Sequence, residues 1–150
     1  MSRIRRVLHA TDFSRASQRA FAQAVDMAQQ NKAELVLLHT LTPITTYMLG
    51  DNYTDDPTLY ARLEESSRRE AESELSALAK KAQRAKVRVR SLLARGTAHE
   101  QILRAAKSCK ADLIVMGTHG RTGLSKLLMG SVAGRVISTA TCPVLTVRGK

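Results

Sequence analysis

Two short runs of aliphatic residues, LVLL at 35–38 and LIVM at 113–116, are apolar at every position and constrain the fold more than any other feature. A strand that is apolar on both faces has to be covered on both faces, as in parallel sheets flanked by helices. Three further segments, residues 4–10, 87–93 and 143–148, also have strand character, and helical periodicity fills the stretches between the five segments. Strands separated by helices in this way run parallel in one sheet.

The order of these segments predicts an α/β fold, with a five-stranded parallel sheet that is doubly wound and has helices on both faces. Residues 87–90 alternate valine with arginine, which is typical of a half-exposed edge strand. This edge position favours the strand order 3-2-1-4-5, with a ligand crevice at the carboxyl ends of strands 1 and 4. The chain is long enough to bury one core, so residues 1–150 are expected to be a single domain.

Local patterns predict where the helices begin and which faces they bury. Ser14 is the expected N-cap of the first helix, and a long charged helix is expected over about residues 58–85. Thr97 and Glu100 have the spacing of a capping box at the start of the third helix. The residues of the last helix that are expected to face inward are Val132, Val136 and Ile137.

Composition narrows the function classes. The net charge of +11 admits nucleic acid, an anionic membrane surface or phosphorylated ligands as partners. With two Phe, three Tyr and no Trp, the chain has little material for base stacking, so specific nucleic-acid binding is not expected. No apolar run approaches the ~20 residues of a membrane span, and no export signal is readable, so we expect a cytoplasmic location. The cysteines and histidines lack metal-ligand spacing, so no metal site is expected.

The loop after the second aliphatic run has the features of a phosphate-binding site. Gly117 and Gly120 follow the predicted strand, and Gly130-Ser131 stands where the last helix begins. Glycine allows close approach of the backbone to a ligand, and a helix N-terminus offers unpaired N–H groups to an anion. The spacing is neither that of a Walker A loop nor that of a dinucleotide-binding fingerprint. Asp12, at the end of strand 1, either binds a ligand in the same crevice or caps the first helix.

Four segments in chain order resemble the universal stress protein family. The spacing Gly117-x2-Gly120-x9-Gly130-Ser131 is similar to the G-x2-G-x9-G-[S/T] nucleotide-binding signature of that family. The opening segment VLHATDFS at 7–14 resembles the family's first strand and the aspartate that follows it. The segments LLHT at 37–40 and CPVLTV at 142–147 resemble the end of its second strand and its final strand.

The resemblance implies a small, dimeric ATP-binding regulatory protein of a stress response, with ATP or ADP over the crevice and Mg²⁺ held through the phosphates. Asp12 would hydrogen-bond the ribose or adenine, and the backbone at Thr40 would contact the adenine edge. Ala10 stands where many members carry valine or proline, and Thr40 where an aliphatic residue is usual. By the same resemblance, Met116 and Gly117 would line the nucleoside, and Gly120, Gly130, Ser131 and Val132 would hold the phosphates.

Several interpretations stay open at this stage. A nucleotidyl-transfer enzyme of related fold and a basic nucleic-acid-binding module are the alternatives to a regulatory ATP-binding protein. We expect at most slow ATP hydrolysis and no catalytic residues, because the glycine loop offers no carboxylate beside the phosphates. The last strand, Val144–Val147, is apolar and expected at a sheet edge, which favours a homodimer through that strand. Residues 42–57 are long enough to reach over the crevice.

Overall fold

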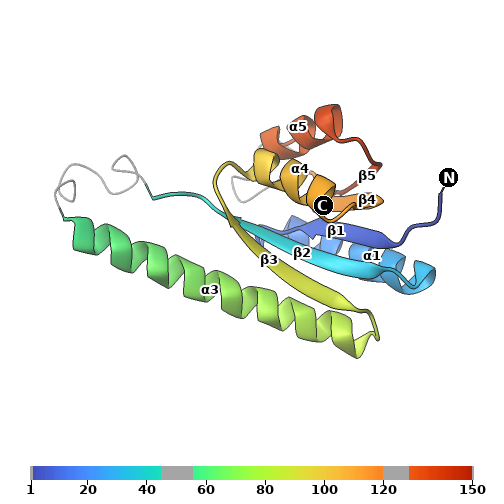
Figure 1. Ribbon diagram of the computed structural model, residues 1–150, viewed down its shortest axis with the longest axis horizontal. Helices are drawn as coiled ribbons and strands as arrows, with labels where there is room; N and C mark the ends of the chain where they lie inside the picture. The colour runs from blue at the N-terminus through green and yellow to red at the C-terminus, as the bar shows by residue number, and fades with distance from the viewer. Residues whose placement is uncertain (1, 45–55, 120–128, 150) are drawn as a thin grey trace.

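The computed structural model describes residues 2–44, 56–119 and 129–149 (Figure 1). Five parallel strands form one sheet in the order β3-β2-β1-β4-β5, which confirms the predicted strand order and the edge position of β3. The elements in chain order are β1 (Arg6–Ala10), α1 (Arg15–Asn31), β2 (Glu34–Leu41), α3 (Pro57–Arg84), β3 (Val89–Arg95), α4 (Ala98–Ser108), β4 (Leu113–Gly117), α5 (Ser131–Thr139) and β5 (Val144–Val147).

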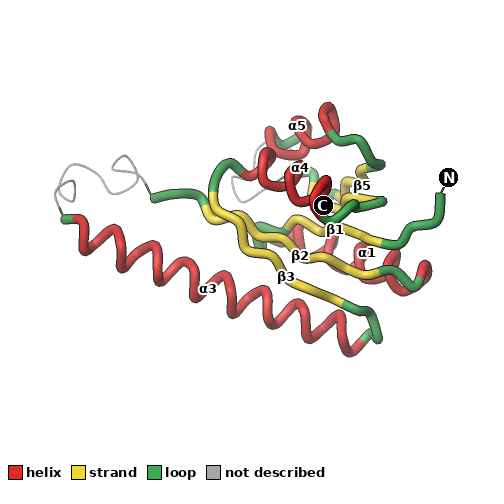
Figure 2. Tube along the Cα trace, viewed as in Figure 1, coloured by secondary structure: helices red, strands yellow, loops and turns green. Residues whose placement is uncertain are grey.

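Helices cover both faces of the sheet, and alternate strand residues supply two separate apolar cores. Val7, Leu35 and Val115 face one side, where they pack with residues of α1 and α3. Leu8 and Ile114 face the other side, where they pack with residues of α4 and α5. Only the C-terminal half of α3 carries its buried residues, and the N-terminal half extends past the end of the sheet (Figure 2). The three central strands are therefore fully enclosed, as their aliphatic sequences require.

The N-cap predicted for α1 is confirmed, whereas the capping box predicted for α4 and the inward position predicted for Ile137 are wrong. Ser14 is the N-cap of α1, and its hydroxyl accepts a hydrogen bond from the Ser17 N–H. Thr97 precedes α4 but makes no side-chain cap bond, so the predicted capping box is wrong: the Thr97 backbone carbonyl alone starts the helix. Ile137 was expected to face inward and is instead 44% exposed. The buried line of α5 passes through Ala133 and Val136, and the next residue lies about 100° farther round the helix.

Candidate functional site

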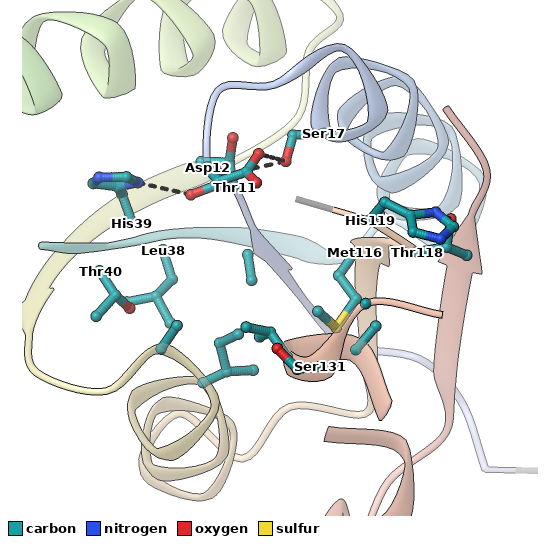
Figure 3. A pocket seen from close by; sticks show the side chains of 17 residues that line it. Thr11, Asp12, Ser17, Leu38, His39, Thr40, Met116, Thr118, His119 and Ser131 are labelled. Carbon is teal, nitrogen blue, oxygen red and sulfur yellow. Dashed lines mark hydrogen bonds between the residues drawn. The ribbon is translucent and has the colours of Figure 1, made fainter. Parts of the chain in front are cut away.

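A cavity of about 290 Å³ lies at the carboxyl ends of β1, β2 and β4, against the start of α5 (Figure 3). This is the place where the strand order predicts a crevice. Eight of the nine residues predicted to contact a nucleotide line this one cavity, and the ninth, Gly120, lies outside the described residues. The eight residues are Ala10, Asp12, Thr40, Met116, Gly117, Gly130, Ser131 and Val132.

Other lining residues were not predicted from the sequence. Ala98 and Ile102, from the first two turns of α4, form part of the apolar wall together with Leu38. Their helical spacing shows that they share a face, but only the folded sheet shows that this face meets the crevice. Ser17 and His39 also line the cavity, and both hold the loop that follows β1.

Asp12 is fixed by hydrogen bonds at the start of α1. Its Oδ1 accepts from the Ser14 N–H at 2.9 Å and from the Ser17 hydroxyl at 2.8 Å. The Ser17 Oγ in turn accepts from the Asp12 N–H at 3.1 Å. The helix-start role that the sequence left open is therefore present in the structure. The same carboxylate also belongs to the cavity lining, so it is held in one orientation at the edge of the cavity (Figure 3).

The residue after Asp12 adopts an unusual backbone conformation. Phe13 has a φ of 64°, a left-handed conformation that is rare for a bulky residue. Its ring packs on the ring of His39, with 4.4 Å between the ring centroids. His39 Nδ1 also donates to the Thr11 carbonyl oxygen at 2.8 Å. The end of β2 thus holds the loop after β1 in the conformation that places Asp12 at the cavity.

The start of α5 provides the anion-binding end of the cavity. Gly130 is the N-cap, makes no side-chain cap bond, and donates its own N–H to the Thr118 carbonyl oxygen at 2.7 Å. The first turn of the helix, beginning at Ser131, has N–H groups with no acceptor four residues earlier in the helix. These donors and the positive end of the helix dipole face the cavity, an arrangement suited to a phosphate group.

Gly117 has a packing role that the sequence did not reveal. A Cβ atom at this position would lie 3.1 Å from the Ala16 Cβ and 3.3 Å from the Ala16 carbonyl carbon. A side chain here would press on Ala16 by a few tenths of an ångström, so glycine suits the close approach of α1 to the end of β4. Gly117 also lines the cavity, so the same residue lies against α1 and at the cavity wall.

The buried histidine of β1 lies outside the cavity lining. His9 is fully buried, and its Nδ1 donates to the Val115 carbonyl oxygen at 2.9 Å. Burial lowers the pKa of His9 from 6.5 to about 4, against the opposing effects of the hydrogen bond to Val115 and the charge of Asp12. The imidazole is thus neutral near pH 7 and acts as a core residue.

The part of the chain that the structure describes has neither a metal-ligand cluster nor a membrane-spanning helix. Within it, no three His, Cys, Asp or Glu side chains come close enough together to hold a metal ion. Cys109 and Cys142 are free thiols, and burial is the main reason that the pKa of each is raised. No helix in the same ranges is long and apolar enough to cross a membrane.

Comparison with known proteins places the chain among relatives of similar length. Residues 3–148 match the model of the universal stress protein family. A universal stress protein of Thermus aquaticus is 38% identical over 142 residues, which cover 95% of this chain and 97% of that protein. The structure of MJ0577, a protein of Methanocaldococcus jannaschii, has a TM-score of 0.85 at 26% identity and covers 99% of both chains.

A universal stress protein from Archaeoglobus fulgidus, solved in complex with dAMP, has a TM-score of 0.68 at 23% identity. That match covers 97% of this chain and 99% of the other, and it extends the agreement in fold. The family model spans nearly all of the sequence, and the fold agrees over the same length. The chain belongs to the universal stress protein family.

Proposed function

We propose that this protein binds ATP or ADP in the cavity at the carboxyl ends of β1, β2 and β4 and acts as a small regulatory protein of the universal stress type. The observation that carries the proposal is that one cavity contains both the N-terminus of α5 and the carboxylate of Asp12. The first is suited to phosphate and the second to sugar hydroxyls. A phosphorylated nucleoside has both groups.

The lining supplies a contact for each part of the nucleotide. The phosphates would accept hydrogen bonds from the backbone N–H groups at the start of α5, beside Gly130 and Ser131. The ribose hydroxyls would donate to Asp12, and the backbone of Thr40 would contact the adenine edge. Met116, together with the apolar wall from α4, would pack against the base. Magnesium enters this proposal only through the phosphates, which are its usual ligands alongside water.

The dimensions and the fold support a nucleotide rather than a smaller anion. A volume of about 290 Å³ is close to the lower end of the range found for small-molecule sites, roughly 300–1,000 Å³. The dAMP complex of the Archaeoglobus fulgidus protein indicates that a sheet of this architecture accommodates an adenine nucleotide. A bare phosphate or sulfate would leave the apolar wall of the cavity unused.

The proposal is tested by calorimetric titration of ATP into the protein and two glycine variants. Gly130 has a φ of −60°, which valine also adopts, so Gly130→Val adds a branched side chain at the phosphate end without backbone strain. We expect its Kd to rise at least tenfold, or about 1.4 kcal/mol.

Gly134→Ala is the matched control, because a Cβ there meets no atom within 4 Å. It is expected to bind ATP with wild-type affinity. If a folded Gly130→Val protein, checked by circular dichroism, binds ATP as the wild type does, the start of α5 is not the phosphate site.

We also propose that two copies of the chain pair through β5. This strand ends the sheet, and no strand among the described residues pairs with its outer side. All four of its residues are half-buried. The carbonyl groups of Pro143 and Val147 accept hydrogen bonds from the neighbouring β4 side. By the alternation of a parallel strand, Val144 and Thr146 direct their backbone groups outward, where a second chain could pair with them.

A further inference from the structure

A concentration of positive charge lies at the amino ends of the strands, at the end of the sheet opposite the nucleotide cavity. The N-terminal segment and the ends of α1 and α3 meet there, at the right of Figure 1. This edge holds a shallow hollow lined largely by basic residues of these segments. We call the surface the basic edge and define it by six exposed residues, Arg3, Arg5, Lys32, Lys86, Arg88 and Lys110.

The carboxylates near the basic edge are already engaged with other groups. Glu34 Oε1 lies 2.8 Å from Arg90 Nε and 3.9 Å from Arg6 Nε. Asp112 Oδ2 accepts hydrogen bonds from the backbone N–H groups of Arg5 and Arg6, at 2.8 and 3.0 Å. Within the described ranges, no ion pair reaches any of the six side chains of the basic edge. Their charge is therefore available to an external anion.

Three of the six residues are lysines in the same unusual backbone conformation. Lys32, Lys86 and Lys110 have φ values of 54°, 61° and 54°, and each occupies the turn between a helix and the strand that follows it. Glycine or asparagine adopts this left-handed conformation more readily than lysine does. Attraction to the negative end of a helix dipole favours a cation in such turns. That attraction does not explain Arg5 and Arg88, because each of them directly precedes a strand, β1 and β3 respectively.

The cations form a row across the ends of neighbouring strands. The Glu34 N–H donates to the Arg5 carbonyl oxygen, and the Leu35 N–H donates to the Arg88 carbonyl oxygen, so Arg5 and Arg88 lie on either side of the start of β2. Neighbouring strands are about 4.8 Å apart. The starts of β1 and β3, beside Arg5 and Arg88, are therefore about 10 Å apart, and Lys32 precedes the strand between them. The row thus presents several cations to the closely spaced phosphates of a nucleic-acid strand.

The composition of this surface selects among polyanions. No aromatic residue belongs to the basic edge or lines its hollow, so nothing there can stack on unpaired bases. The large apolar residues exposed in the described part of the chain are Met129 and Ile137, in and beside α5, so the basic edge has no apolar side chain to insert into a membrane. A duplex backbone, which requires neither stacking nor insertion, fits best.

We propose that the basic edge binds the phosphate backbone of double-stranded nucleic acid without sequence selectivity. Each lysine or arginine that neutralises a phosphate releases counterions, so the affinity should fall steeply as salt rises. The bound duplex would lie at the amino ends of the strands, whereas the cavity lies at their carboxyl ends.

The test is fluorescence anisotropy with a labelled mixed-sequence DNA duplex, at several salt concentrations between about 50 and 200 mM. The main variant combines Lys32→Asn, Lys86→Asn and Lys110→Asn, because asparagine removes the charge and suits the left-handed conformation. We expect this variant to keep its thermal stability and to bind the duplex at least about tenfold more weakly. The slope of log affinity against log salt concentration should be smaller in magnitude by about 2 to 3. A second variant, Arg5→Gln with Arg88→Gln, leaves the turns intact and should also weaken binding.

The matched control removes three exposed charges elsewhere, through Arg19→Gln, Arg62→Gln and Arg104→Gln. The proposal predicts that this variant keeps the wild-type affinity and salt slope. An equal loss of duplex affinity in the control and in the lysine variant would show that net charge alone attracts the duplex, and it would overturn the proposal. Absence of duplex binding by the wild type would overturn it as well. So would a wild type that binds vesicles of anionic phospholipid more tightly than the duplex through the same lysines.

Discussion

Acid should destabilise this protein through one buried side chain, His9. Its ring lies in the core beneath α1, with 5.9 Å between its centroid and that of Phe21. Its Nδ1 hydrogen is donated to Val115, and its Nε2 is buried with no hydrogen-bond partner among the described residues. A proton added at Nε2 would have to be held in an apolar core, which is why the folded protein keeps this histidine neutral.

The size of the effect follows from the difference in pKa between the two states. In the unfolded chain, His9 takes up a proton near its ordinary pKa of 6.5, whereas burial holds the pKa in the folded protein at about 4. The stability associated with this difference is fully present above pH 6.5 and is lost as the pH falls towards 4. At about 1.4 kcal/mol for each unit, the free energy of unfolding should fall by about 3 kcal/mol across this window.

The assay is urea denaturation of the wild type and of His9→Leu at several pH values from about 7 to 4. Carboxylates titrate in both proteins, so the difference between the two pH profiles isolates His9. We expect the profile of His9→Leu to be flatter by about 2 to 3 kcal/mol. Val7→Ala, a core substitution on the same strand, should lower stability without changing the pH dependence. Parallel profiles for the wild type and His9→Leu would refute the reasoning.

Three other substitutions test separate parts of the structure. Gly134→Ala should raise the free energy of unfolding by about 0.5–1 kcal/mol, because the site is helical and open, and a lower melting temperature would contradict this. Asp12→Ala should lose about 1 kcal/mol of stability, whereas Asp12→Asn keeps an oxygen acceptor at the helix start. Both variants should bind ATP more weakly than the wild type, and wild-type ATP affinity in both would limit Asp12 to a structural role. Thr146→Pro removes an outward N–H from β5 and should shift the sedimentation profile from dimer to monomer, and a wild type that is monomeric at micromolar concentration would rule out the proposed dimer.

The strand order could be predicted because hydrophobic patterns depend on where a strand lies. The alternation of valine and arginine in residues 87–90 marks an edge, and the uninterrupted aliphatic runs at 35–38 and 113–116 mark the interior. The crevice follows from that order, since it is a property of the winding. The order alone predicts that Asp12 and the glycine loop after β4 face one crevice. The resemblance to the universal stress protein family supplied the other lining residues: Ala10, Thr40, Met116 and Val132.

The features that could not be predicted depend on contacts between distant segments. The tight packing at Gly117 comes from Ala16, a residue of another element. Ile102 reaches the cavity because α4 packs beside β2, and its own sequence pattern shows only that it is buried. The left-handed turns at Lys32, Lys86 and Lys110 were not predicted because lysine has no preference for that conformation. Local composition cannot reveal a conformation that the surrounding fold imposes.

Hydrogen exchange with and without saturating ATP tests the central claim most directly, because it locates the nucleotide as well as detecting it. Binding in the proposed site should slow exchange of the backbone N–H groups in the first turn of α5 and in the segment from Asp12 to Ser17 at the start of α1. The turns at Lys32 and Lys86 should stay unchanged. Protection confined to other segments, or ATP binding with no change at the start of α5, would contradict the account.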